Sequence, residues 1–410
     1  MKISEVIQTL EAFAPLPYQE SYDNAGLLTG SNSWECTGIL CTLDATEAVV
    51  NEAVQQNCNL VVAHHPIIFS GLKKITGKNY VERTIIAAIK NNIAIYAIHT
   101  NLDNVYNGVS RRMAEKLGLQ NCKVLDPKPG LLKKLYTYVP VDDAEKVRAA
   151  IFKAGAGDIG NYGECSFNIE GIGTYRPQEG ADPYIGEIGK RAETKEVKLE
   201  IIFPAHLQRQ VIAAMLQAHP YEEVAYDVIT LSNEFQQVGS GMTGELPEAM
   251  SEGDFLQRIK DEFKLQVIKH TPLLNKNVKK VALCGGAGSF LLPKAIAAGA
   301  DFYITSDVKY HEFFDADGRI VFADIGHWES EQFTIDLLFD ILQAKFRNFA
   351  ILKTGIVTNP VYYFGELWVV NGEVRNINGA FTCIVLHFTK NYILQRKSYI
   401  QICLQLKIIQ

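Results

Sequence analysis

The chain contains the stretch Leu60-Val61-Val62-Ala63-His64-His65-Pro66. Its apolar, β-branched first part has the length of a buried strand, and the proline ends that strand. Ligands of α/β sheets collect at the carboxyl ends of strands, and neutral imidazole is the commonest protein ligand for transition metals. His64 and His65 therefore predict a metal site; the alternative is that one ring caps a turn and the other faces solvent.

Strands and helices alternate around this stretch. Residues 38–43 and 93–98 have the pattern of short buried strands, and residues 46–56 and 80–91 have that of amphipathic helices. Such alternation is typical of βαβ units, which form parallel sheets. We therefore expect an α/β core.

Polar residues also follow the strand predicted at 93–98. His99 and Asp103 come shortly after its end. Because connected strands of βαβ units usually lie close together, we expect these side chains to meet His64 and His65 at one edge of one sheet.

A third group of polar residues lies far along the chain. After strands predicted at 301–305 and 319–323, His327 and Glu331 begin a long helix that is predicted to continue to about residue 346. Spaced i and i+4, these two side chains share one helix face. Such a pair alone is more often a solvated helix start, but together with the first group it predicts further metal ligands.

A glycine-rich turn, residues 285–289, joins a buried strand predicted at 281–284 to a helix. A turn of this kind at a helix N-terminus can cradle a phosphate. The sequence lacks the Gly-Lys-Ser/Thr that would complete a nucleotide-binding loop, so glycines that only permit tight packing are the stronger alternative.

The middle of the chain has a different pattern. Two strand-helix-strand segments, 135–174 and 197–231, form an internal repeat that predicts a ferredoxin-like domain inserted into the core. Glycine-rich residues 238–244 are expected to be the linker that returns to the core. His206 and His219 of the insert have no ligand partner nearby in sequence and are expected to be surface or core residues.

The composition limits the classes of function. With 47% hydrophobic and 21% charged residues, the 410-residue chain is long enough for two or three domains. Its net charge of −6 disfavours a nucleic-acid partner. The eight cysteines are scattered without paired motifs, which favours free thiols, and the start of the chain predicts an amphipathic helix instead of a signal peptide. We therefore expect a cytoplasmic protein without a membrane span.

The expected ligands are His64, His65, Asp103, His327 and Glu331. Three histidines and two carboxylates exceed the needs of one divalent ion, and they suit two ions that share a bridging carboxylate. Nitrogen and oxygen donors without thiolate indicate zinc, taken as the first choice, or iron, manganese or nickel. An open coordination position would hold a water that ionises near neutral pH.

Several motifs along residues 1–364 resemble one family. They are Tyr22-Asp23-Asn24-x-Gly26-Leu27, Ala63-His64-His65-Pro66, His99-Thr100-Asn101-Leu102-Asp103, Thr305-x-Asp307-x-x-x-His311 and Gly326-His327-x-x-Ser330-Glu331. In order and placement they are similar to those of the GTP cyclohydrolase 1 type 2 homologue family, also called the NGG-interacting-factor-three-like proteins. Tyr22 stands where a tryptophan is common in that family.

This resemblance implies a two-lobed α/β core that binds two metal ions through the five ligands above, with Glu331 as the bridging residue. It implies that the insert resembles the PII/CutA-like domain of longer bacterial members. It also implies a toroidal homohexamer whose metal sites face an inner cavity.

We divide the chain into four regions. Residues 1–126 and 236–364 form the two halves of the core, and residues 127–235 form the ferredoxin-like, PII/CutA-like insert. Residues 365–410 resemble nothing in the family and form either a strand-forming extension or a poorly packing tail. We expect that deletion of this tail leaves metal binding intact.

Two classes of function fit these predictions. One is a metal-dependent hydrolase that acts on a nucleotide or related heterocycle, in which His99, His311 and Glu329 are proton-transfer or supporting groups; plain packing or solvation is the alternative for each of the three. The other is a non-catalytic metal-handling or regulatory protein whose insert senses a small ligand. A ring that threads DNA is disfavoured by the net charge.

Overall fold

The computed structural model describes residues 1–364, 369–370 and 373–374. The chain divides into two compact units, Met1–Thr358 and Asn359–Gln410. All the predicted site residues belong to the first unit.

In the second unit, two short strands pair antiparallel: β16 (Val369–Val370) and β17 (Glu373–Val374). The rest of the extension predicted at 365–410 lies outside the described residues. The expected tolerance to its deletion stays a prediction.

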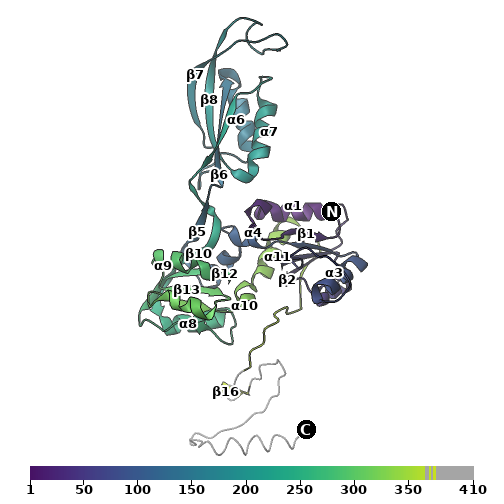
Figure 1. Cartoon of the computed structure of the whole chain (residues 1–410), viewed down its shortest axis with the longest axis vertical. Helices are drawn as coiled ribbons and strands as arrows, with labels where there is room; N and C mark the ends of the chain where they lie inside the picture. Colours follow the sequence, from purple (N-terminus) through teal and green to yellow (C-terminus); the bar gives the residue numbers. More distant parts are fainter. Residues whose placement is uncertain (365–368, 371–372, 375–410) are drawn as a thin grey trace, which may run out of the picture. The chain divides into compact units, whose positions relative to one another are not determined.

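The first lobe of the core is a five-stranded sheet covered by helices (Figure 1). Its elements are α1 (Ile3–Phe13), β1 (Gly26–Thr29), β2 (Ile39–Asp44), α2 (Glu47–Gln55), β3 (Leu60–His65), α3 (Tyr80–Lys90), β4 (Ala94–Ala97), α4 (Thr100–Asn104), α5 (Val109–Lys116), α11 (Thr334–Lys345) and β15 (Ile351–Lys353). The strand order is β1-β4-β3-β2-β15, in which only β1 runs antiparallel to its neighbour. The predicted parallel α/β arrangement is confirmed.

Strand β3 is buried on both faces, which explains its unbroken apolar run. Leu60 and Val62 pack in the cluster that contains residues of α1 and α11. Val61 and Ala63 point the other way, into the cluster with residues of α2 and α3. Because both faces are covered, the first polar side chains of the strand, the two histidines, come at its carboxyl end.

The second lobe is a six-stranded mixed sheet. Its elements are β5 (Gln120–Pro129), β10 (Glu234–Ser251), α8 (Glu252–Glu262), β11 (Lys269–His270), β12 (Asn277–Ala287), α9 (Leu292–Ala297), β13 (Phe302–Ser306), β14 (Val321–Asp324) and α10 (His327–Glu331). The order is β11-β14-β13-β12-β10-β5, and β12, β13 and β14 are parallel. Their carboxyl ends form a second ligand-bearing edge.

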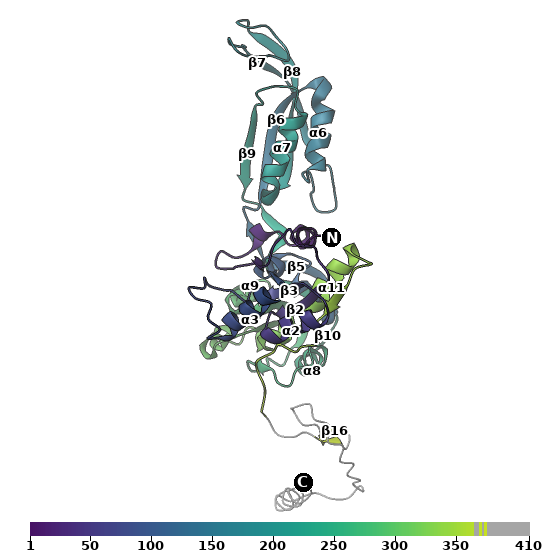
Figure 2. The ribbon, with the colours of Figure 1, turned by 90° about the vertical axis from the view of Figure 1, so that its right-hand side faces the viewer.

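The insert is an antiparallel sheet with two helices on one face (Figures 1 and 2). Its elements are β6 (Leu132–Pro140), α6 (Ala144–Lys153), β7 (Phe167–Tyr175), β8 (Ala192–Pro204), α7 (Gln208–Ala218) and β9 (Tyr226–Leu231). The strand order β7-β8-β6-β9 is that of a ferredoxin-like fold. Its likeness to PII or CutA proteins stays a prediction.

Short 3₁₀ helices complete the described elements. They are η1 (Leu16–Tyr18), η2 (Val141–Asp143), η3 (Ala205–Leu207), η4 (Ser289–Leu291) and η5 (Tyr310–Ala316).

The segment predicted as a return linker, residues 238–244, is the middle of strand β10, so this prediction was wrong. Its glycines allow β5 to approach closely. A Cβ on Gly239 would lie 2.2 Å from the Asp126 carbonyl oxygen, and one on Gly244 would lie 3.0 Å from Cys122 Sγ. Strands β5 and β10 also run through the predicted domain boundaries near residues 126 and 235, which stay predictions.

The long helix predicted from His327 to about residue 346 is two helices, α10 and α11. Gln332 follows α10, and its side-chain amide donates to the Glu329 and Phe263 carbonyls, which tethers the break to the second lobe. The sequence contains neither proline nor glycine at the break, so its pattern could not reveal it. The i, i+4 relation of the two ligand residues is kept within α10.

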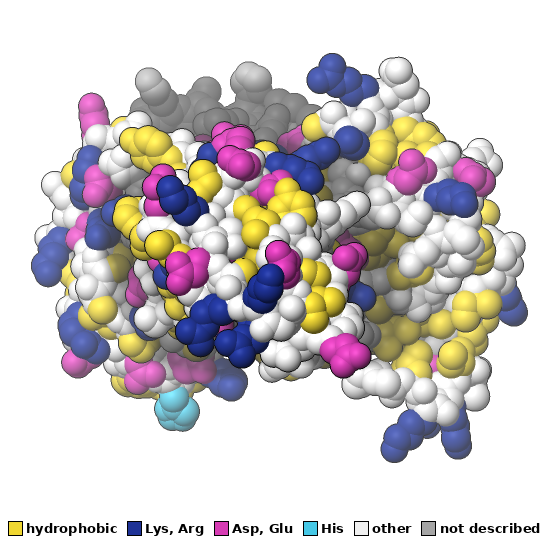
Figure 3. All heavy atoms as spheres, turned by 90° about the horizontal axis from the view of Figure 1, so that it is seen from above, with side chains coloured by type: hydrophobic (Ala, Val, Ile, Leu, Met, Phe, Trp, Pro, Cys, Tyr) yellow, Lys and Arg dark blue, Asp and Glu magenta, His cyan; other side chains and the backbone are white. Residues whose placement is uncertain are grey.

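The surface carries both signs of charge. Lysine and arginine side chains are interspersed with aspartate and glutamate on the face that Figure 3 shows. Among the described residues, no helix is both long and apolar enough to cross a membrane.

Candidate metal centre

Parallel strands bring the first group of ligand residues together. His64 and His65 are the last two residues of β3. β4 pairs in parallel beside it, and His99 follows β4 as the N-cap of α4. Asp103 lies on this helix, and its carboxylate faces His64.

The second lobe supplies the other ligand residues through α10. Gly326 has a φ of 90°, a conformation that glycine adopts readily, and it turns the chain from β14 into the helix. His327 and Glu331 then occupy the ends of one helical turn. Glu331 is buried, with only 3% of its surface exposed, and its carboxylate points into the centre.

One oxygen of Glu331 faces two histidines. Oε2 lies 2.9 Å from His65 Nε2 and 3.1 Å from His327 Nε2, and these two nitrogens are 3.3 Å apart. Ligands at about 2.0–2.1 Å from a tetrahedral zinc ion would be spaced by roughly 3.3 Å. The three atoms therefore fit the face of one metal coordination sphere.

The other oxygen of Glu331 faces a second group. Oε1 lies 3.9 Å from His64 Nε2, which is 3.5 Å from Asp103 Oδ1. His64 Nε2 and Asp103 Oδ1 are buried and have no hydrogen-bond partner in the described part of the chain. Buried polar atoms without partners are costly, and a bound cation would satisfy both.

The opposite nitrogen of each imidazole is held by an acceptor. His64 Nδ1 donates to the Ile98 carbonyl at 2.8 Å. The remaining pairs, from Nδ1 to a carboxylate oxygen, are His65 with Asp44 at 2.8 Å, His99 with Asp23 at 2.8 Å and His327 with Asp307 at 2.7 Å. In metal sites this arrangement fixes the ring orientation and raises the basicity of the free nitrogen.

These three carboxylates were missed as site residues by the sequence analysis. Asp23 and Asp307 lie inside the quoted motifs, so a signal for them was present. Asp44 ends β2, at the same sheet edge as the histidines, and its position was the available signal.

The charges of the cluster shift its pKa values strongly. Burial lowers the pKa of His65, but its contacts with Asp44 and Glu331 outweigh burial and raise the pKa to about 10. Burial likewise lowers the pKa of His327, and Glu331 and Asp307 raise it to about 11. Without metal, both rings are therefore protonated at neutral pH.

The two ligand carboxylates shift in opposite directions. Burial acts to raise the pKa of Glu331, but the three neighbouring histidines hold it well below its usual range. Burial raises the pKa of Asp103 above its usual value, with His64 opposing this effect. Glu331 is therefore favoured as the charged form in the metal-free site, whereas burial disfavours the charged form of Asp103.

The glycine-rich turn has a role that differs from a phosphate cradle. A Cβ on Gly286, whose φ is +64°, would lie 2.4 Å from Glu331 Oε1. Its amide donates to the Ser330 hydroxyl at 3.0 Å. The helix that follows begins after a 3₁₀ turn and has six residues. The glycine thus makes room for the Glu331 carboxylate.

The structure brings together all five predicted ligands and His99. Three groups have donor atoms close enough to share an ion: His64 with His65 and His99; His65 with His327 and Glu331; His64 with Asp103 and Glu331. The individual roles stay predictions.

Two predicted supporting residues do not join these groups. His311 lies on η5 in ring contact with Tyr310 and Phe314. Glu329 lies on α10 but belongs to none of the metal-type groups found among the described residues.

In the insert, His219 is buried and hydrogen-bonds the Tyr138 carbonyl, and His206 pairs with the Tyr18 hydroxyl. Both have the structural roles expected of them.

Metal binding should release protons, because His65 and His327, whose pKa values are raised, must each lose a proton to coordinate an ion. With pKa values of about 10 and 11 in the metal-free protein, His65 and His327 stay protonated from pH 6 to 9. The metal association constant should therefore rise by up to about a factor of 100 for each pH unit in this range. Titration calorimetry with zinc in buffers of different ionisation enthalpy should detect about two protons released per chain at pH 7. Binding that is independent of pH would contradict this assignment.

Replacing Asp307 by asparagine should weaken metal binding about 10- to 100-fold, because His327 loses the charge that orients it. Asp307 has a φ of 56°, which asparagine also adopts readily, so the fold should not change. Zinc affinity by competition with a chromogenic chelator measures the loss. Asp336→Asn, which removes an exposed partner of Lys353, is the control and should bind normally.

The fold and the site define a two-lobed α/β protein with a candidate metal centre at the ends of both sheets. In sequence, residues 1–360 match the Duf34/NIF3 family (NGG1p interacting factor 3), and the chain belongs to this family. The resemblance identified from the motifs is confirmed.

Relatives of known name or structure cover most of the chain. A Halalkalibacterium halodurans protein named GTP cyclohydrolase 1 type 2 homolog is 40% identical over 369 residues, which are 88% of this chain and 99% of that protein. A crystal structure of a Bacillus cereus protein related to NIF3 is 40% identical, with a TM-score of 0.79 over 89% of this chain and 99% of that one. A Staphylococcus aureus structure is 29% identical, with a TM-score of 0.71 and the same coverage.

Proposed function

We propose that this chain binds two divalent metal ions that share Glu331 and hydrolyses a nucleotide or related heterocycle. The observation that supports this most directly is the position of the Glu331 carboxylate, whose two oxygens face two separate donor groups. Bridging carboxylates of this kind recur in two-metal hydrolytic sites. The names of the relatives make GTP the first substrate to test.

The donor set favours zinc. One group offers two imidazole nitrogens and a carboxylate oxygen, and the other offers an imidazole nitrogen and two carboxylate oxygens. Three protein ligands with a free position are typical of catalytic zinc sites, although iron, manganese and nickel accept the same atoms. A bound ion would supply a water that ionises near neutral pH.

The chain's own groups beside the ligands are suited to proton transfer and to holding a ring. His99 is held by Asp23, whose pKa is lowered to about 2 because the hydrogen bonds from His99 and Thr100 outweigh its burial. The centroid of the Phe69 ring lies 6.0 Å from that of His99, which it meets edge-on, and 6.5 Å from that of Tyr22, on which it stacks. Both aromatic rings are more than half exposed, so a planar substrate ring can stack on them.

The test combines metal content with turnover. Protein purified without chelators or an affinity tag should contain two ions per chain by mass spectrometry, and chelation should abolish release of hydrolysis products from GTP. His99→Gln should lower turnover at least about 100-fold, as expected for loss of a general acid or base, and should raise KM little. His311→Gln, outside the three groups of donor atoms, is the matched control. Turnover by metal-free protein would exclude the proposal.

We also propose that the chain assembles as a toroidal homohexamer, as its family resemblance implies. Sedimentation analysis at several protein concentrations would test this. A monomer at all concentrations would contradict it.

The alternative is a metal-handling or regulatory protein. The observation that favours it is a pocket of about 610 Å³ in the insert, which suits a small ligand. Two bound ions without turnover of any nucleotide would favour this alternative over the hydrolase.

A further inference from the structure

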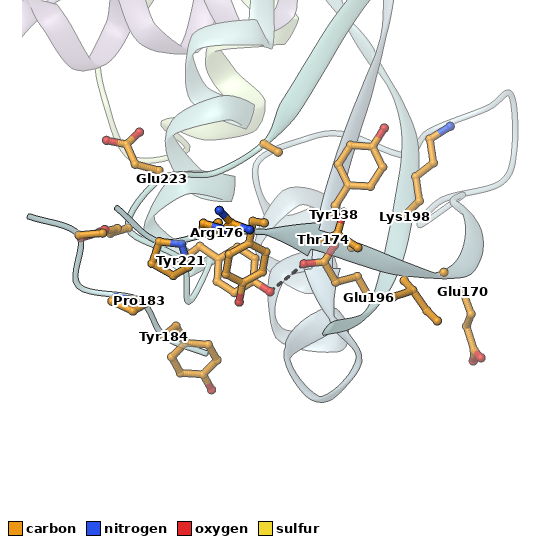
Figure 4. A pocket seen from close by; sticks show the side chains of 18 of the residues that line it. Tyr138, Glu170, Thr174, Arg176, Pro183, Tyr184, Glu196, Lys198, Tyr221 and Glu223 are labelled. Atoms are coloured by element: carbon orange, nitrogen blue, oxygen red, sulfur yellow. Dashed lines mark hydrogen bonds between the residues drawn. The ribbon is translucent and has the colours of Figure 1, made fainter. Parts of the chain in front are cut away.

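The insert contains a pocket on the sheet face opposite its two helices (Figure 4). On β8, Val197 and Leu199 are buried in the cluster with residues of α6 and α7, so the alternating Glu196 and Lys198 point to the other face. Both of these residues line the pocket. A volume of about 610 Å³ is ordinary for a site that holds a small molecule.

A buried carboxylate lies in this pocket. Glu196 is only 8% exposed, and its Oε1 accepts a hydrogen bond of 2.7 Å from the Tyr221 hydroxyl. Its Oε2 occupies the space above Gly173, where a Cβ would lie 2.1 Å away. A carboxylate has about four lone-pair sites, so Glu196 can accept further hydrogen bonds from a ligand while it keeps Tyr221.

Three tyrosine rings lie beside this carboxylate, tilted against one another by 62° and 58°. The centroid of the Tyr221 ring lies 6.0 Å from that of Tyr175 and 6.2 Å from that of Tyr184, and all three residues line the pocket. The Tyr175 hydroxyl is fixed by donation to the Ile185 carbonyl at 2.8 Å. Burial, and then the Glu196 hydrogen bond, raises the pKa of Tyr221, so its hydroxyl stays a donor. Each of these rings offers a face on which a flat ligand can pack.

The charges of the lining favour a ligand that donates hydrogen bonds. Besides Glu196, the acidic residues Glu170, Glu222 and Glu223 line the pocket, against the basic Arg176 and Lys198. Lys198 is also engaged outside the pocket by Glu200, at 2.8 Å. An anionic ligand would therefore meet an excess of negative charge.

We propose that this pocket binds a planar heterocycle that presents two adjacent N–H donors on one edge, as a guanine ring does. The Glu196 carboxylate accepts both donors, and the flat face of the heterocycle packs on one of the three tyrosine rings. The match is geometric, because the two oxygens of a carboxylate have the spacing of the ring N–H and the exocyclic amino group. The site is separate from the metal centre and does not depend on hydrolysis there.

Calorimetric titration of the full chain with guanosine tests the proposal. Guanosine should bind, and inosine, which lacks the exocyclic amino group, should bind at least tenfold more weakly. Glu196→Gln should weaken guanosine binding at least tenfold, and Tyr221→Phe, which keeps the ring, by a smaller factor. Glu193→Gln, an exposed carboxylate on the same strand and outside the pocket, is the matched control.

Further variants separate this site from the metal centre. Guanosine binding that persists in Glu331→Gln and in chelator-treated protein would support the insert site, and loss in both would place the ligand at the metal centre and overturn the proposal. If Glu196→Gln fails to fold by circular dichroism, Gly173→Ala, whose methyl group displaces the carboxylate, should give the same loss. No binding at millimolar guanosine also overturns the proposal. If Ile172→Glu then lowers the sedimentation coefficient, the pocket is a surface for self-association.

Discussion

Replacing Glu331 by glutamine should remove both metal ions from the protein. The substitution keeps the shape of the side chain but removes the charge that both groups of donors share. Loss of a ligand that bridges two ions should cost more affinity than the 10- to 100-fold typical of an outer hydrogen-bond partner. Mass spectrometry should find less than about a tenth of the wild-type metal per chain.

The same variant should also change the metal-free protein. His65 and His327 lose the carboxylate that their Nε2 atoms share but keep Asp44 and Asp307, so their pKa values should fall without leaving either ring unpaired. Breaking a fully buried ion pair costs about 3–5 kcal/mol, and the loss here should be smaller because both rings are partly exposed, keep a second carboxylate and can lose their protons. Denaturant unfolding at pH 7 and at pH 9 should show a smaller deficit at the higher pH. Glu329→Gln, on the same helix, should retain its metal; retention of two ions by Glu331→Gln would refute the bridging role.

Gly286→Ala should abolish metal binding although it adds only a methyl group. Its Cβ would lie 2.4 Å from Glu331 Oε1 and 3.4 Å from His327 Cε1, so the carboxylate must move out of the centre. The left-handed φ of +64° adds about 1 kcal/mol of backbone strain.

Gly299→Ala separates these two effects. Gly299 has a φ of +70° with nothing within 4 Å of an added Cβ, so this control carries the strain without the clash. Gly299→Ala should lose about 1 kcal/mol in denaturant unfolding and Gly286→Ala should lose more because it adds the clash, and only Gly286→Ala should lose metal. Equal metal content in the two variants would show that Gly286 does not make room for Glu331.

Much of the centre could be predicted from the sequence because its ligands sit at the ends of regular elements. The run before His64 and the i, i+4 spacing of His327 and Glu331 each carry a periodic signal. Parallel strands then bring their carboxyl ends to one edge, which is a property of βαβ topology and not of any single residue.

The parts that sequence could not predict depend on packing between distant segments. Asp44 and Asp307 become partners of the histidines only after two sheets are formed, and the glycines of β10 look like loop residues until β5 lies against them. Pro129 is paired with Glu234 across that contact, although the two residues are more than one hundred positions apart. Local patterns contain no information about such separations.

That pairing has a consequence for how the chain can be shortened. The Cα atoms of residues directly opposite in an antiparallel ladder are about 4.5–5.5 Å apart. A two-residue turn such as Asn-Gly can therefore connect Pro129 directly to Glu234. The inserted domain from β6 to β9 can therefore be removed, because its two connections to the core lie side by side. A shortened protein without the insert, and the insert expressed alone, would show which of the two binds metal and which binds the small ligand.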